Sequence, residues 1–190
     1  MLASRCPSHL ISFLLPCLLL IASFCLFPPA AVADLNNDRF DGNIFVVYAG
    51  NGSLVPPRLT LKQSLARQMP VILVYYLDDN SDCKKFAPVV SRLQEFYGRV
   101  ASIIPVNVDS ITMKEEYQPD EVGYYYRGAI PQTVILAQNG NKVFDEVGLI
   151  EFEQADGVLR RLFGLLPPTK STTLKRESFN EFNSEFVGEN

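Results

Sequence analysis

Histidine and cysteine are scarce in this 190-residue chain, and their scarcity excludes several kinds of chemistry. The one histidine, His9, lies in the N-terminal leader, so the rest of the chain has none for general-base catalysis or a His-rich metal site. Three of the four cysteines, Cys6, Cys17 and Cys25, also lie in the leader. Cys83 is the one thiol of the remaining chain, so no internal disulfide is expected there.

The chain also lacks a block of basic residues, and its formal net charge is -4. This charge balance argues against a nucleic-acid partner. With one cysteine and no histidine beyond the leader, a carrier of chlorophyll or of an iron–sulfur cluster is poorly supported. We therefore expect no cofactor and no metal. The composition, 47% hydrophobic and 20% charged, is typical of one globular domain with appendages.

Residues 1–33 have the pattern of an export signal. Arg5 gives a positive start, Leu10 to Phe27 is a long apolar run, and Ala31 to Ala33 has the A-x-A form of a cleavage site. A cleaved signal peptide is favoured, and an uncleaved membrane anchor is the alternative because the apolar run is nearly long enough to span a bilayer. In both cases a domain at 34–166 and a polar tail at 167–190 lie outside the cytoplasm.

The domain predicts alternating strands and helices. The run V-I-L-V-Y-Y-L is continuously apolar, as in a strand buried on both faces, whereas Pro105 indicates an edge strand or a bulge. Asn139-Gly140 predicts a hairpin turn. The expected strands are Asn43–Ala49, Val71–Leu77, Ser102–Val108, Gln132–Ala137 and Val143–Val147. The expected helices are Thr60–Gln68, a helix from near Cys83 to Gly98, a short one within Ile111–Arg127, and one from Phe152 to Leu166.

This order, βαβαβαββα, resembles the thioredoxin fold, with a mixed central sheet flanked by helices. In thioredoxins a buried strand runs into W-C-G-P-C-K, a proline follows five residues after the second cysteine, and an Ile-Pro with a cis peptide lies beside the active site. Here the strand runs into Asp79-Asn80-Ser81-Asp82-Cys83-Lys84, Pro88 follows at the same spacing, and the later element is Ile130-Pro131.

The redox chemistry of thioredoxins does not carry over. The attacking cysteine is matched by Asn80, and an amide is not a nucleophile for disulfide exchange. The preceding tryptophan is matched by Asp79 and the buried proton-shuttling acid by Val74. Because three parts of the catalytic apparatus are missing together, we predict a protein that is not a thiol–disulfide enzyme.

The retained residues each allow two interpretations. Cys83 is either a structural buried residue or a redox thiol, and the aspartates at 78, 79 and 82 should raise its pKa. Those aspartates are either loop and cap residues or a cation site. Ile130-Pro131 is either a turn that the fold needs or one side of a peptide-binding groove. Tyr124-Tyr125-Tyr126-Arg127 is either an interface or packing beneath that turn.

A narrower resemblance is carried by four segments: Asp41 to Arg58, Asp78 to Lys84, Gly123 to Gly128, and Pro131 to Val134. In these the chain is similar to the cyanobacterial thylakoid membrane photosystem I accumulation factors. The resemblance implies a thylakoid membrane or lumen location, a photosystem I subunit or assembly intermediate as partner, and a role in photosystem I assembly. A protein acting through the single thiol of Cys83 is the alternative. The predicted binding residues are Asp79, Asn80, Ser81, Asp82, Cys83, Tyr124, Tyr125, Tyr126, Arg127, Ile130 and Pro131.

Overall fold

The computed structural model describes residues 34–167, so the predictions for the leader and for the tail beyond Pro167 fall outside the described residues. The centre of this part is a mixed four-stranded sheet in the order β2-β1-β3-β4. Strands β1 and β2 are parallel, and β3 runs antiparallel to both β1 and β4. The strands are β1 (Val71–Tyr76), β2 (Ser102–Asn107), β3 (Gln132–Leu136) and β4 (Lys142–Val147).

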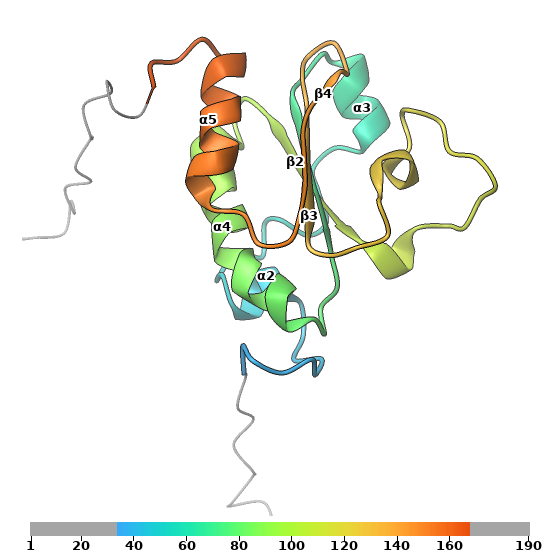
Figure 1. The fold of residues 1–190 in the computed structure, drawn as a ribbon, viewed down its shortest axis with the longest axis vertical. Helices are drawn as coiled ribbons and strands as arrows, with labels where there is room; N and C mark the ends of the chain where they lie inside the picture. Colours follow the sequence, from blue (N-terminus) through green and yellow to red (C-terminus); the bar gives the residue numbers. More distant parts are fainter. Residues whose placement is uncertain (1–33, 168–190) are drawn as a thin grey trace, which may run out of the picture. The chain divides into compact units, whose positions relative to one another are not determined.

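Both faces of this sheet are covered by other elements (Figure 1). The first face carries α2 (Ile44–Val47), α4 (Ser81–Tyr97) and α5 (Phe152–Leu162), and the second carries α3 (Leu61–Ala66) with a long segment containing the 3-10 turn η2 (Val122–Tyr125). Successive β1 residues alternate between the two cores, with Val74 in the first and Tyr75 in the second. Every β1 residue is buried because both faces are covered.

The prediction of a thioredoxin-like α/β fold is confirmed by the strand order and by the terminal hairpin and helix. The expectation that Pro105 marks an edge strand is also confirmed, because β2 is the outermost strand on its side of the sheet. Proline has no N–H to donate, so it is tolerated where no further strand follows. Thr60, the first residue of the predicted helix Thr60–Gln68, is the N-cap of α3 and forms a complete capping box with Gln63.

The prediction of a first strand at Asn43–Ala49 was wrong, since this segment contains the short helix α2. Its β-branched and aromatic residues are typical of a strand, but tertiary contacts decide otherwise. The Asn43 side chain caps the helix by accepting from the Phe45 amide, and Asp78 accepts from the Ile44 amide at 3.0 Å. Two adjacent residues, Ile44 and Phe45, are buried, which a one-sided strand would not allow.

Two other boundaries differ from the prediction. The segment Ile111–Arg127 contains no α-helix; it contains η2, and another 3-10 turn, η1 (Val108–Ser110), precedes it. The last helix, α5, ends at Leu162 and not at Leu166, since Gly164 adopts a positive φ of 63° that breaks the helix. Leu165 and Leu166 are consequently exposed.

Candidate functional site

Asn80, at the position of the attacking cysteine of thioredoxins, is the N-cap of α4. Its side-chain oxygen accepts from the Cys83 amide at 2.9 Å, and its carbonyl accepts from the Lys84 amide at 3.0 Å. Asparagine is among the best N-cap residues because its side-chain oxygen satisfies a free amide of the first turn. The residue that replaces a nucleophile thus has a structural role at the helix start.

Asp38, which precedes α2 in the chain, also binds the start of α4. Its carboxylate accepts from the Ser81 amide at 2.8 Å. This backbone hydrogen bond is the main reason that the pKa of Asp38 lies below its usual value. A helix N-terminus stabilises negative charge, which in thioredoxins is the charge of the thiolate. Here the helix N-terminus stabilises the negative charge of the Asp38 carboxylate instead. No pattern in the sequence predicts this contact.

Lys84 connects residues 37–41, which precede α2, to α4. The side chain of Lys84 is fully buried. Its Nζ atom donates to the Arg39 carbonyl at 2.5 Å, the Asp41 carboxylate at 2.7 Å and the Asn37 carbonyl at 3.0 Å. The Tyr48 hydroxyl donates to the same carboxylate at 2.6 Å. Together these contacts hold residues 37–48 against the start of α4.

The charges in this cluster support each other. Hydrogen bonds from Lys84 and Tyr48 hold the pKa of Asp41 well below its usual range. Desolvation lowers the pKa of Lys84, but its contacts with Asp41 and Tyr48 together outweigh this, so the pKa lies above the ordinary value. Sequence reasoning missed this pair. Asp41 begins one of the four segments that resemble the photosystem I accumulation factors, and Lys84 ends another. This placement is the signal that could have suggested the ion pair.

Asp78 serves as an acceptor for backbone and amide groups. It accepts from the Ile44 amide at 3.0 Å and from the side chains of Asn43 and Asn107, each at 3.3 Å. These contacts join α2 to the end of β2 across β1. Within residues 34–167, no group of three His, Cys, Asp or Glu side chains could hold a metal ion. The structural interpretation of the aspartates is therefore favoured for Asp78.

Cys83 lies in the first turn of α4, and only 1% of it is exposed. Burial raises the pKa of its thiol to about 11, and the aspartates at 82, 78 and 79 contribute to this rise. The direction agrees with the sequence prediction, but burial is the larger cause. At neutral pH the thiol is protonated and shielded, whereas redox-active cysteines carry an accessible thiolate.

The Ile130-Pro131 peptide is cis, as the resemblance to thioredoxins implied. The Pro131 carbonyl accepts from the Gly148 amide at 2.7 Å, which ties the turn to the end of β4. Ile130 is partly buried and packs against the cores on both faces of the sheet. Within residues 34–167, the Ile130 N–H and carbonyl form no backbone hydrogen bond. These two groups are therefore available to an added strand.

The tyrosine-rich segment divides into packed and exposed residues. Tyr125 is buried and donates to the Pro119 carbonyl at 2.9 Å. Tyr126 stacks on Tyr75 with ring centroids 5.2 Å apart. By contrast, Tyr124 is 53% exposed, and Arg127 is exposed with its guanidinium 3.6 Å from Asp145. Within this segment, only Tyr124 and Arg127 therefore remain candidates for contact with a partner.

The fold brings only some of these residues together. Cys83 belongs to the core on the α4 face, whereas Tyr125 belongs to the core on the opposite face. Tyr126 lies near Cys83, and burial together with this thiol raises the pKa of Tyr126. Tyr124 and Arg127 line a hollow of about 380 Å³ with the hairpin turn at Asn141 and Lys142. The predicted site is thus two neighbouring surfaces and not one cleft.

The chain is similar to several known proteins. No family model matches the chain. Two solved thioredoxins are similar over 53% of the chain: Deadhead from Drosophila melanogaster (20% identical, 93% of its chain, TM-score 0.41) and that of Fasciola hepatica (18%, 89%, 0.42). A thylakoid membrane protein of Synechocystis, slr1796, is 57% identical, and the match covers 97% of this chain and 94% of that protein. On this similarity, the chain belongs to the family of the Synechocystis thylakoid membrane protein slr1796.

Proposed function

We propose that this chain is a non-catalytic factor that supports photosystem I assembly or accumulation at the thylakoid membrane by binding a photosystem I subunit or an assembly intermediate. The observation that carries the proposal is the start of α4. Asn80 and Asp38 there bind backbone donors that would stabilise an attacking thiolate in a thioredoxin. A thioredoxin-like fold without the attacking nucleophile is suited to binding and not to electron exchange.

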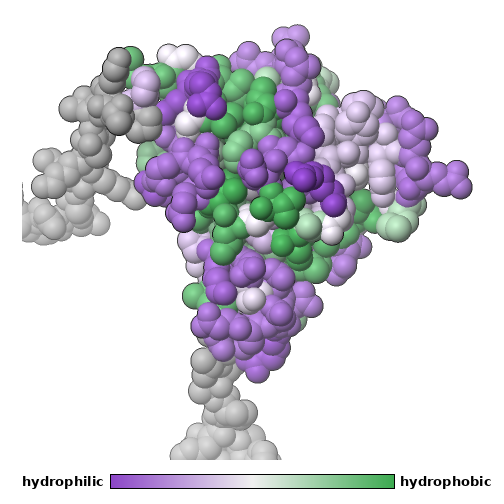
Figure 2. Space-filling view, in the orientation of Figure 1, coloured by the Kyte–Doolittle hydropathy of each residue, from purple (hydrophilic) through white to green (hydrophobic). Residues whose placement is uncertain are grey.

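The proposed binding surface has two parts. The first is the exposed acidic side of the α4 start, Asp79 and Asp82, at an end of the domain that is covered by hydrophilic side chains (Figure 2). The second is Tyr124 with Arg127, and tyrosine and arginine are enriched in protein interfaces. The Ile130 N–H and carbonyl lie at the turn before β3 and can pair with an extended segment of the partner.

The proposed location follows from the family and the leader. The relative carries the name of a thylakoid membrane protein, and residues 1–33 have the pattern of an export signal. We place the domain at the thylakoid membrane on the lumenal side. Within residues 34–167, no helix is long and apolar enough to cross a bilayer. We propose that the leader or the partner attaches the domain to the membrane.

Photo-crosslinking in thylakoid membranes tests the binding proposal. A photo-reactive amino acid is placed at Asp79 or Tyr124, and at the exposed Arg161 of α5 as a control. We expect positions 79 and 124 to crosslink to a photosystem I subunit, and position 161 not to. A deletion strain should contain less photosystem I. Normal photosystem I content in that strain, with no photosystem I subunit crosslinked from either site position, would contradict the proposal.

The alternative of a single-cysteine redox protein is tested by Cys83→Ser. The burial of Cys83 and its pKa of about 11 argue against this alternative. We expect a strain carrying Cys83→Ser to keep its photosystem I content, provided that immunoblotting shows the same amount of the protein. Loss of photosystem I at an equal protein level would favour the redox function.

A further inference from the structure

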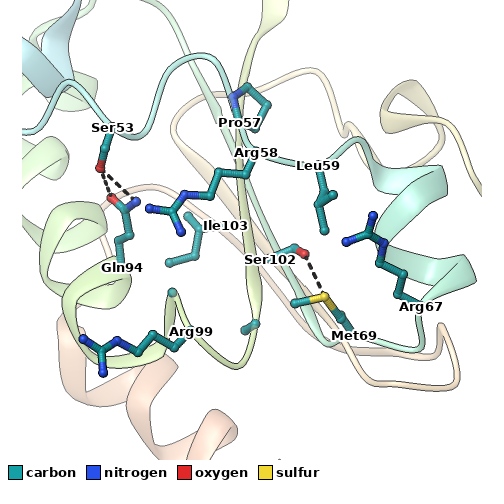
Figure 3. A pocket seen from close by; sticks show the side chains of 12 residues that line it. Ser53, Pro57, Arg58, Leu59, Arg67, Met69, Gln94, Arg99, Ser102 and Ile103 are labelled. Carbon is teal, nitrogen blue, oxygen red and sulfur yellow. Dashed lines mark hydrogen bonds between the residues drawn. The ribbon is translucent and has the colours of Figure 1, made fainter.

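A cavity of about 430 Å³ opens at the other end of α4, away from the candidate site. It lies where α3 and α4 end and β2 begins, and the loop between α2 and α3 covers it (Figure 3). Its size falls within the range of cavities that bind small molecules. The residues that matter for its chemistry are Arg58, Arg67, Arg99, Met69, Ala101 and Ile103.

Three arginines line the cavity without a carboxylate partner. Arg58, Arg67 and Arg99 form no ion pair with any residue of the part that the structure describes, whereas most other arginines there pair with an acid. All three arginines are exposed. Figure 3 shows the Arg58 guanidinium turned towards Gln94 and the Arg67 guanidinium on the side of Leu59, with Arg99 pointing away at the rim. Glu95 lies in an adjoining hollow, so the cavity itself is lined by positive charge and no acid.

Helix ends explain two of these arginines but not the third. Arg67 is the C-cap of α3, and Arg99 follows the C-cap of α4, where a cation is favourable next to the free carbonyls. Arg58 lies in the loop before α3 and has no helix end beside it. Its guanidinium nevertheless turns towards Gln94, which also lines the cavity. Arginine is the preferred residue for binding oxyanions because its planar donors form paired hydrogen bonds.

The floor of the cavity is apolar. Met69, Ala101 and Ile103 form it, and Leu59 adds a further apolar side chain from the covering loop. The Ser102 hydroxyl is engaged with Ser64, at an oxygen–oxygen distance of 2.9 Å. A ligand that fits both parts has an apolar body for the floor and a negatively charged head for the guanidinium groups of Arg58 and Arg67.

We propose that this cavity binds an amphipathic oxyanion, a molecule with a phosphate or sulfonate head and a short apolar chain or ring. The exposed side chains of Arg58 and Arg67 turn towards the head and bind it, and the apolar body lies on Met69, Ala101 and Ile103. Such a head is found on anionic membrane lipids and on soluble organic phosphates, and the test distinguishes these sources. This site is independent of the proposed photosystem I function and does not involve Cys83 or Asn80.

Ligand-observed NMR on the full chain in a neutral detergent tests the proposal. Hexyl phosphate is the soluble probe, inorganic phosphate lacks the apolar part, and hexanol lacks the charge. We expect hexyl phosphate to bind most tightly, and Arg58→Gln or Arg67→Gln to weaken it at least about tenfold, as expected when a charged hydrogen-bond donor is lost. Arg161→Gln, which removes an exposed guanidinium of α5, should leave the affinity unchanged. Equal thermal unfolding midpoints show that the variants are folded.

Arginine modification gives a readout that needs no variant. Hexyl phosphate should slow the reaction of phenylglyoxal with Arg58 and Arg67 but not with Arg161, as measured by mass spectrometry.

A lipid-retention experiment distinguishes the source of the head. The protein is exchanged into micelles containing phosphatidylglycerol or phosphatidylcholine. Retention of phosphatidylglycerol alone, lost in Arg58→Gln, identifies a lipid headgroup, whereas binding of hexyl phosphate without lipid retention identifies a soluble ligand. No binding of either probe, equal affinity for inorganic phosphate, or binding unaffected by both substitutions would overturn the proposal.

Discussion

The two ends of α4 differ in how their polar groups are used. At the start, backbone amides and charged side chains are paired: Asn80 and Asp38 accept from amides, and Lys84 is enclosed by acceptors. At the other end, Arg58 and Arg67 have no carboxylate partner among the described residues. The first end is the one at which a thioredoxin carries out its chemistry, yet here its polar groups stabilise the fold.

If the arginine-lined cavity binds an oxyanion as proposed, charge without an ion-pair partner marks the ligand site of this protein better than the position of the thioredoxin active site does. Charged groups that are buried or crowded are normally paired, because an unpaired charge loses the stabilisation of water. Paired charges at the α4 start leave little free capacity for a small ligand, so we assign a protein partner to its outer surface. The arginines at the far end keep their donors available. Three measurements test this difference between the two ends of α4.

The largest effect is expected from Lys84→Met, compared with Arg99→Met at the opposite end of α4. Losing Lys84 takes a donor from the carbonyls at positions 37 and 39 and from the Asp41 carboxylate, which is only 9% exposed. Removing one member of a buried ion pair is strongly destabilising. We expect Lys84→Met to lower the thermal unfolding midpoint most, and Arg99→Met to leave it nearly unchanged. Similar midpoints, measured by circular dichroism, would show that the two ends do not differ.

An intermediate effect is expected from acid. The pKa values of Asp38 and Asp41 are lowered in the folded protein by hydrogen bonds from the Ser81 amide and from Lys84 respectively. Their contribution is therefore fully present above the unfolded value of 3.8 and is lost as the pH falls below it towards the folded values. Denaturant titrations from neutral pH down to about pH 3 should show this loss.

The control for the acid experiment separates these carboxylates from exposed ones. Asp41→Asn should be less stable at neutral pH and should lose less stability in acid, because the titrating group is gone. Asp79→Asn, at an exposed position near the same helix start, should keep the wild-type dependence. An unchanged acid dependence in Asp41→Asn would remove this carboxylate from the explanation.

The smallest effect is expected from Asn80→Ala. The substitution removes the side-chain cap of α4 and should lower the free energy of unfolding by about 1 kcal/mol, whereas Asn80→Ser keeps a capping oxygen and should change it much less. Urea titrations of the two variants provide the comparison. Equal loss in both would mean that the amide of Asn80 has another role, and no loss in either would mean that the cap contributes little.

The sequence predicted the sheet well but one element at its margin wrongly. The apolar run Val71–Leu77, Pro105 and Asn139-Gly140 each report a local requirement: burial on both faces, an edge position and a tight turn. Asn43–Ala49 was misassigned because its local preference for a strand is overridden by contacts with Asp78, which comes over 30 residues later. The end of α5 was overestimated because Leu165 and Leu166 extend an apolar pattern past Gly164.

The candidate site was predicted in parts. The cis Ile130-Pro131 peptide and the raised pKa of Cys83 were expected and found. The separation of Cys83 and Tyr125 onto opposite faces of the sheet was not expected, because spacing along the chain does not report the side on which a loop returns. The contacts of Asp38 and Lys84 were missed for the same reason, and so was the arginine-lined cavity.

Residue types and their spacing along the chain were enough to predict the fold class, the loss of the attacking thiol and the amide of Asn80 in its place. Folding added what the sequence pattern did not report: the Asp38 carboxylate at the start of α4, and guanidinium groups at the other end of α4 with no carboxylate partner within residues 34–167. The physical reason is that hydrogen bonds and ion pairs depend on distances in space, and folding brings together residues such as Asp38 and Ser81 that are far apart in the chain.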